Sequence, residues 1–302
     1  MKILKKRESL IENMAFMGII AAILVILNSL IALSDMYLPI LALFLSLLLP
    51  MLVTLVEVSC KDRYYPIFFL TTLLLSFVVT LWNFQATFYY LLPSLISGYI
   101  FGLIIKKRVP LVYGLFLSSV IQTVLIYGFN RLVEGLFEID SIEIILTILK
   151  LNESVGARNI ILLTIFAFAL IEMSFVSLVI SFELSRFQLT FNDDIGSPFI
   201  IDGILFGLAL ATAMLYFISL WGAYLVFGFM IYFLFVLVTN GLKTKKFWLL
   251  APYFVLSILG AILFILLNKY FADYSGFLLF GTIPLLIALF DLIFNLLNNK
   301  RI

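Results

Sequence analysis

The pattern of apolar and polar positions divides the chain into long uncharged stretches separated by short charged segments. Residues 13–34 and 36–56 contain no charged side chain, and residues 64–105 form an uncharged run about twice as long. The polar sequence Asn83, Phe84 and Gln85 interrupts this longer run near its middle. Because a helix needs about 20 apolar residues to cross the hydrocarbon core of a bilayer, these stretches predict four membrane-spanning helices.

The remaining apolar stretches, which are uncharged except for Glu172 and Asp291, predict six more helices. Residues 203–242 form a second double-length run, and Ser219 to Gly222 are its expected turn. The single stretches are residues 109–130, 159–182, 247–268 and about 276–297. The chain is therefore expected to be an all-α, polytopic transmembrane helical bundle of about ten spans.

The charged residues support this division and give it a direction. Only 12% of the residues are charged, whereas soluble domains carry about 25%. All but four of the 19 Lys and Arg residues fall on one side of the alternating spans, and the exceptions are Arg131, Lys150, Arg158 and Lys269. By the positive-inside rule, both termini are expected in the cytoplasm. With a basic N-terminus and no cleavable signal or transit pattern, we expect a multi-pass protein of a bacterial plasma membrane.

The longest outer connection, residues 131–158, mixes apolar and acidic positions. This pattern predicts an amphipathic helix that lies in the outer interface of the bilayer. Such a helix could form a lid over a site between spans, or it could serve only in packing.

The composition excludes most catalytic chemistry. The chain has no histidine, and Cys60 is its single cysteine, so disulfide frameworks and the usual zinc, haem and iron ligand sets are missing. The sequence also contains no phosphate loop, H-E-x-x-H or G-x-S-x-G pattern. We expect neither enzymatic activity nor a bound cofactor or metal, and no nucleic-acid partner.

Glu172 is the most informative side chain, because it lies near the middle of the stretch 159–182. An ionisable group at this depth costs several kcal/mol, about 2.5 to 3.5 for a central charge, so it must face protein or water. Its expected partners are Gln122, Asn83, Gln85 or a bound cation, and without a partner it would be protonated. Two interpretations stay open: a substrate or ion site, or a neutral carboxyl bonded to a neighbouring helix.

Other acidic residues are expected to have less specific roles. Asp291, near the inner end of the last span, is expected to be structural or interfacial. The acids at span ends are expected to be hydrated, and they are Glu57, Glu183 and Asp202.

Small residues recur at a spacing of four on three predicted helices. Such faces allow helix backbones to approach closely. They are Gly98 with Gly102, Gly203 with Gly207 and Ala211, and Gly18 with Ala22. Packing within the chain is the simplest role for these faces.

Two segments give the chain a resemblance to known membrane proteins. The segment Pro93 to Arg108 ends in a basic loop, and with the Gly18 and Ala22 face it makes residues 1–190 resemble a substrate-binding S component of the energy-coupling factor vitamin transporters. Residues 191–302 would be a four-helix C-terminal extension. The tail Leu285 to Arg301 has apolar residues around an Asp before a basic end. With the segment Pro93 to Arg108, it makes the whole chain resemble the YybS-like family of uncharacterised bacterial membrane proteins, which resembles an S component extended at its C-terminus.

The resemblance implies a function in solute uptake. Gly18 and Ala22 would dock onto a transmembrane coupling subunit that works with a separate ATPase. A small-molecule solute would bind between helices four to six, near Gln85, Gln122 and Glu172, in a site open to the outside. The alternative is a non-transporting scaffold or biogenesis factor that recruits partners through its small-residue faces. An outward cavity lined by Glu172 and Gln122 favours transport, whereas a closed bundle with these groups paired favours the scaffold.

Overall fold

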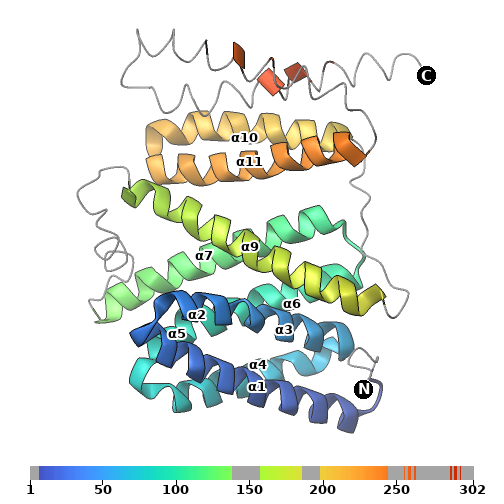
Figure 1. Cartoon of the computed structure of the whole chain (residues 1–302), viewed down its shortest axis with the longest axis vertical. Helices are drawn as coiled ribbons and strands as arrows, with labels where there is room; N and C mark the ends of the chain where they lie inside the picture. Colours follow the sequence, from blue (N-terminus) through green and yellow to red (C-terminus); the bar gives the residue numbers. More distant parts are fainter. Residues whose placement is uncertain are drawn as a thin grey trace. The chain divides into compact units, whose positions relative to one another are not determined.

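The computed structural model describes residues 7–137, 157–185 and 198–243, together with a few single helical positions between 255 and 293. Every regular element in this part of the chain is a helix (Figure 1). The predicted all-α class is therefore confirmed. The chain divides into two compact units: unit 1 comprises residues 1–149 and 165–194, and unit 2 comprises residues 150–164 and 195–302.

Eight helices of the described residues are long and apolar enough to cross a membrane. They correspond in order to the first eight predicted spans, so the chain is an integral membrane protein. The last two predicted spans, with Asp291, lie outside the described residues, and the total of ten stays a prediction. The eight are Leu10–Tyr37, Leu41–Ser59, Asp62–Val79, Leu81–Lys106, Leu111–Gly135, Ile161–Ser181, Ile200–Ile218 and Leu220–Leu237.

The first two crossings of unit 1 consist of three helices. Helix α1 (Leu10–Tyr37) forms the first, and α2 (Pro39–Ser46) with α3 (Leu48–Ser59) form the second. The break between α2 and α3 at Leu47 falls shortly before Pro50. Because Pro50 has no backbone N–H to offer the preceding turn, the hydrogen-bond ladder is interrupted at this point.

The long uncharged run separates into two crossings where its polar residues predicted a break. After the short turn η1 (Asp62–Tyr64), α4 (Tyr65–Val79) forms the third crossing. Asn83 ends the turn η2 (Leu81–Asn83), and its side chain donates to the carbonyl of Ala32 on α1 at 3.0 Å. The fourth crossing follows as a continuous helix made of α5 (Phe84–Ala86), the π-helical turn η3 (Thr87–Leu91) and α6 (Leu92–Lys106).

Helix α7 (Leu111–Phe137) is longer than the pattern of charges predicted. It continues through Arg131, the expected start of an interfacial helix, so that prediction is wrong for residues 131–137. Residues 138–156 lie outside the described part of the chain. Helix α9 (Ala157–Ser185) follows and runs obliquely across α7 in Figure 1.

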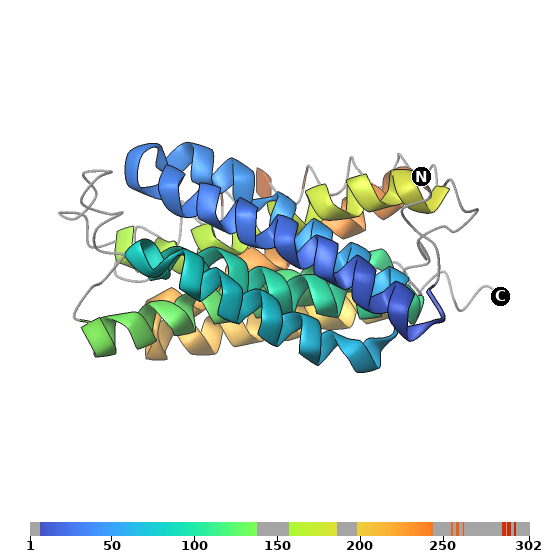
Figure 2. The same cartoon turned by 90° about the horizontal axis from the view of Figure 1, so that it is seen from below.

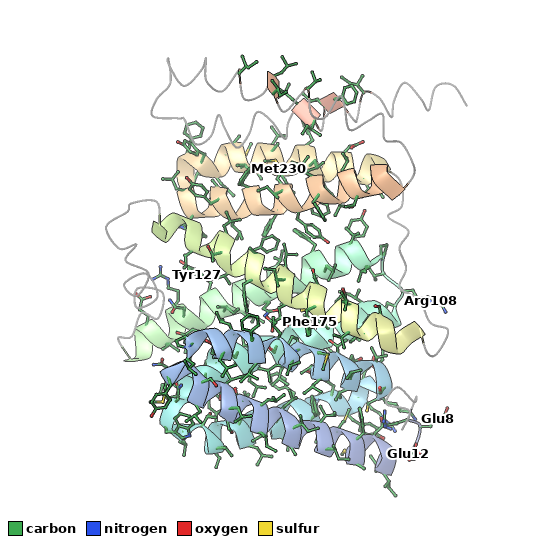
Figure 3. The ribbon with its side chains drawn as sticks, in the orientation of Figure 1. Glu8, Glu12, Arg108, Tyr127, Phe175 and Met230 are labelled. Carbon is green, nitrogen blue, oxygen red and sulfur yellow. The ribbon has the colours of Figure 1, made fainter. Side chains whose placement is uncertain are left out.

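The helices of unit 1 alternate in direction. At one end, the Arg7 N–H donates to the carbonyl of Ser59 at 3.1 Å, and Lys106 Nζ donates to the carbonyl of Cys60 at 3.0 Å. These contacts bring the start of α1 to the ends of α3 and α6. Figure 3 places Glu8, Glu12 and Arg108 at this same end and Tyr127 at the opposite one. Arg7, Lys106 and Arg108, which are expected on the inner side, thus lie at one end of unit 1. The helices of unit 1 run along roughly the same axis in Figure 2.

Helices α3 and α6 pack closely because α6 presents glycines to α3. A Cβ atom added at Gly98 would lie 2.7 Å from the Pro50 carbonyl oxygen, and one at Gly102 would lie 2.6 Å from Glu57 Cβ. The Thr54 hydroxyl lies 3.1 Å from the Gly98 carbonyl oxygen, to which it donates. The predicted packing role of Gly98 and Gly102 is confirmed.

Unit 2 contains a helical hairpin formed by α10 (Pro198–Ile218) and α11 (Leu220–Lys243). The turn lies at Ser219, as predicted from the second double-length run. The Ser219 N–H donates to the Leu215 carbonyl at 2.7 Å, and its Oγ accepts from the Gly222 N–H at 3.4 Å. No described atom lies within 4 Å of a Cβ built at Gly203 or Gly207, so the role of that face stays a prediction.

Candidate functional site

Glu172 of α9 points into protein. Only 1% of its surface is exposed, and the adjacent Met173 is fully buried. Met173 and Val176 form a hydrophobic cluster with Phe101 of α6. The carboxylate is therefore on the face of α9 that packs against the other helices of unit 1, as the cost of burying a charge in lipid requires.

Gln122 of α7 is the partner of Glu172. Its Nε2 donates to Glu172 Oε2, and the glutamine itself is 2% exposed. A ring contact between Phe116 and Phe166, with centroids 6.2 Å apart, also joins α7 to α9. Of the partners predicted for Glu172, the hydrogen bond therefore confirms Gln122. Asn83, another predicted partner, bonds to α1 instead.

Four buried oxygen atoms on α7 and α9 have no hydrogen-bond partner. They are Glu172 Oε1, Gln122 Oε1, Ser118 Oγ and Ser119 Oγ, and all are buried. Ser118 and Ser119 precede Gln122 by four and three residues, so the three side chains are neighbours on the surface of α7. We refer to Glu172, Gln122, Ser118 and Ser119 as the Glu172 site. The two serines were missed by the sequence reasoning, although their spacing from Gln122 was the available signal.

Gln85 lies at a different level of unit 1. It is half-buried in α5, one turn before Tyr89. The Tyr89 hydroxyl donates to Asn130 Oδ1 on α7 at 3.1 Å. Asn130 follows Gln122 by eight residues, which is roughly 12 Å along a helix axis. The structure therefore joins Glu172 to Gln122 without Gln85, whose role in binding stays a prediction.

A second polar cluster lies where α3 and α6 end. Lys106 Nζ contacts Glu57 Oε1 at 2.7 Å and also forms an ion pair with Asp62. Glu57 is 1% exposed, so the expectation that it is hydrated is wrong. The close approach of α6 at Gly102 covers Glu57, and Lys106, one turn later, supplies the opposite charge.

Asp202 and Glu183 are the other two acids at span ends that were expected to be hydrated. Asp202 of α10 is fully buried, so the expectation is wrong there too. The side chain of Glu183 lies outside the described residues.

The segment before α1 is held to the end of α3 by Asn13. The Asn13 Nδ2 donates to the Ser9 carbonyl at 2.6 Å and to the Arg7 carbonyl at 3.1 Å, while its Oδ1 accepts from the Lys61 N–H at 3.0 Å. Beside it, burial raises the pKa of the Cys60 thiol to about 11. The single cysteine of the chain is thus neutral at physiological pH.

Gly18 and Ala22 lie on an open face of α1. Both are exposed, and no described atom lies within 4 Å of a Cβ built at Gly18. Ile19 and Ile23 beside them are exposed as well. In a membrane protein, such an apolar surface contacts lipid or another protein.

No protein-family model, curated protein or solved structure matches the chain. The site is therefore interpreted from its own geometry, and the resemblance to S components stays a prediction.

Proposed function

We propose that this integral membrane protein binds a small solute within the bilayer at the Glu172 site. The observation that carries the proposal is the group of four buried oxygens without hydrogen-bond partners. Leaving a buried polar group unsatisfied costs about 1 to 3 kcal/mol. A solute that donates to these oxygens, or is coordinated by them, offsets this cost.

The proposal includes uptake in the manner of an energy-coupling factor S component. Gly18 and Ala22 would contact a transmembrane coupling subunit, because small side chains permit close helix approach and this face of α1 is open among the described residues. A separate ATPase would supply the energy, since the sequence has no phosphate loop. The expected location is the bacterial plasma membrane.

A scaffold is the second candidate, and the pairing of Glu172 with Gln122 favours it. Both side chains are almost fully buried and joined by a hydrogen bond, as expected of a closed bundle. Solute entry would require α9 to move relative to α7. In the scaffold interpretation, the pair only fixes these helices together.

One experiment distinguishes the uptake function from the scaffold function. The protein is purified from native membranes in mild detergent, and mass spectrometry identifies the proteins and small molecules bound to it. If the protein functions in uptake, an ATPase and a coupling subunit should co-purify with the wild type and be lost from a Gly18→Leu, Ala22→Leu variant. Val78→Phe is the control, because it adds bulk to an apolar side chain that is 67% exposed on another helix, α4. Recovery of other envelope proteins, with no ATPase, would support the scaffold.

Glu172→Gln tests the binding site itself. The change keeps the shape and a hydrogen-bonding group but removes the carboxylate. The proposal expects the co-purified solute to be lost while the purified protein stays folded. If the only effect is altered thermal stability, the Glu172 site has a structural role.

A further inference from the structure

The donor set of the Glu172 site consists of oxygen alone. It contains one carboxylate oxygen, one amide carbonyl oxygen and two hydroxyl oxygens, all buried and without partners. Oxygen ligands of this kind suit hard cations, whereas nitrogen and sulfur suit transition metals. The atoms come from two helices that are in direct contact through Gln122 and Glu172.

The two serine hydroxyls differ from those of Ser94 on α6 and Thr123 on α7, which bond to their own helices. A buried serine or threonine in a membrane helix commonly donates to a carbonyl of the preceding turn. Ser94 donates to Tyr90 at 2.6 Å and Thr123 donates to Ser119 at 2.7 Å in this way. Ser118 and Ser119 make no such bond, so their oxygens are free to bind a ligand.

The charge balance of the Glu172 site indicates a ligand with a single positive charge. Among the described residues of α3, α6, α7 and α9, the other buried carboxylate is Glu57, which is already paired with Lys106. Glu172 has an amide as its partner, and an amide carries no charge. One positive charge neutralises one carboxylate, while a divalent ion would leave an uncompensated charge at bilayer depth, which is costly.

We infer that the Glu172 site binds a monovalent alkali cation, held by Glu172, Gln122, Ser118 and Ser119. The inference rests on the proposed function, because it names the solute class of that site. Direct contact of Gln122 with Glu172, both nearly fully buried, suits a single ion better than an organic solute. The cation neutralises the carboxylate and fills the four free oxygens.

Radioactive sodium binding to the purified full-length protein tests the inference, with potassium as competitor and N-methyl-glucamine chloride keeping the ionic strength constant. We expect saturable binding of one ion per chain. Thermal unfolding should shift upward with sodium or potassium chloride and not with the organic salt, because a ligand that binds only the folded state stabilises it.

Variants of the Glu172 site test which side chains hold the ion. Glu172→Gln should abolish binding, and Ser118→Ala with Ser119→Ala should weaken it by about tenfold or more. Ser94→Ala is the control, since this buried hydroxyl on α6 is bonded to its own helix. Equal binding in wild type and Glu172→Gln would overturn the inference.

The failure of the cation inference is distinguishable from that of the proposed function. If neither alkali ion binds, but an organic molecule co-purifies with wild type and is lost in Glu172→Gln, the inference fails and the proposed function stands. If nothing binds and Glu172→Gln changes at most the thermal stability, both fail, and Glu172 has a structural role as the hydrogen-bond partner of Gln122.

Discussion

Lys106 joins three segments of unit 1 through one ammonium group. It neutralises Glu57, forms an ion pair with Asp62 and donates to the Cys60 carbonyl. The pair with Glu57 is asymmetric, because the glutamate is 1% exposed and the lysine side chain is 26% exposed. Loss of the lysine would leave the glutamate buried without a counter-charge.

Lys106→Met is expected to lower the free energy of unfolding by about 2 kcal/mol. Breaking a fully buried pair typically costs about 3 to 5 kcal/mol, and the partial exposure of Lys106 reduces this value. Thermal unfolding of the purified protein measures the effect. Lys107→Met, at an exposed position, is the control and should change little. An equal loss in both variants would mean that the Glu57 contact does not stabilise the fold.

The raised pKa of the Cys60 thiol predicts that the stability of the folded protein decreases at alkaline pH. Its folded pKa of about 11 lies above the ordinary value of 9.0, so the folded state keeps the proton longer than the unfolded state. This contribution to stability is present below pH 9 and declines as the pH rises toward 11. Alkylation by iodoacetamide at pH 8 should be slow until denaturant is added, and Cys60→Ala should reduce the decline in stability between pH 9 and 11. Rapid alkylation of the folded protein would contradict the prediction.

At the scale of elements, the contact of α3 with α6 depends on glycine. Gly98→Ala places a Cβ atom 2.7 Å from the Pro50 carbonyl oxygen, and a backbone atom cannot turn aside. We expect a loss of about 1 to 3 kcal/mol, typical of overpacking, measured by thermal unfolding. Gly18→Ala is the matched control, because its Cβ meets no described atom and alanine favours the helix. A stability unchanged in Gly98→Ala would show that α6 can shift without cost.

The sequence predicted the ends of elements where polarity decides them. Asn83 and Ser219 interrupt apolar runs, and the helices break there. The end of α7 was wrong because Arg131 was interpreted as the end of a span. In the structure Arg131 pairs with Glu134 at 2.6 Å and lies over the Tyr127 ring. Local compensation of the charge allows the helix to continue.

The sequence predicted the candidate site only in part, because it shows which side chains are polar but not how closely the helices approach. Glu172 stands out because it is charged, and Gln122 because few polar side chains are available to it. Ser118 and Ser119 carry no such signal, since a serine in a membrane helix commonly bonds to its own backbone. Glu57 was misjudged because its burial depends on how closely Gly102 lets α6 approach, a tertiary distance that no local pattern contains.

At the scale of the whole molecule, the orientation in the membrane is the main prediction. The basic residues at one end of unit 1 predict that this end faces the cytoplasm. In a Cys60→Ala background, a cysteine at Lys107 should react with a membrane-impermeant maleimide only in inverted vesicles. A cysteine at Glu134, near the far end of α7, should react only in intact cells. The reverse pattern would overturn the predicted topology.

The pairing of Glu57 with Lys106 also bears on how the chain is made. The two residues are 49 positions apart, and at elongation rates of about 5 to 20 residues per second the lysine follows the glutamate from the ribosome after roughly 2.5 to 10 seconds. During that interval α3 carries an acidic group whose counter-charge has not yet been synthesised. Glu57 on the second crossing is therefore neutralised by Lys106 only after the fourth crossing has been synthesised.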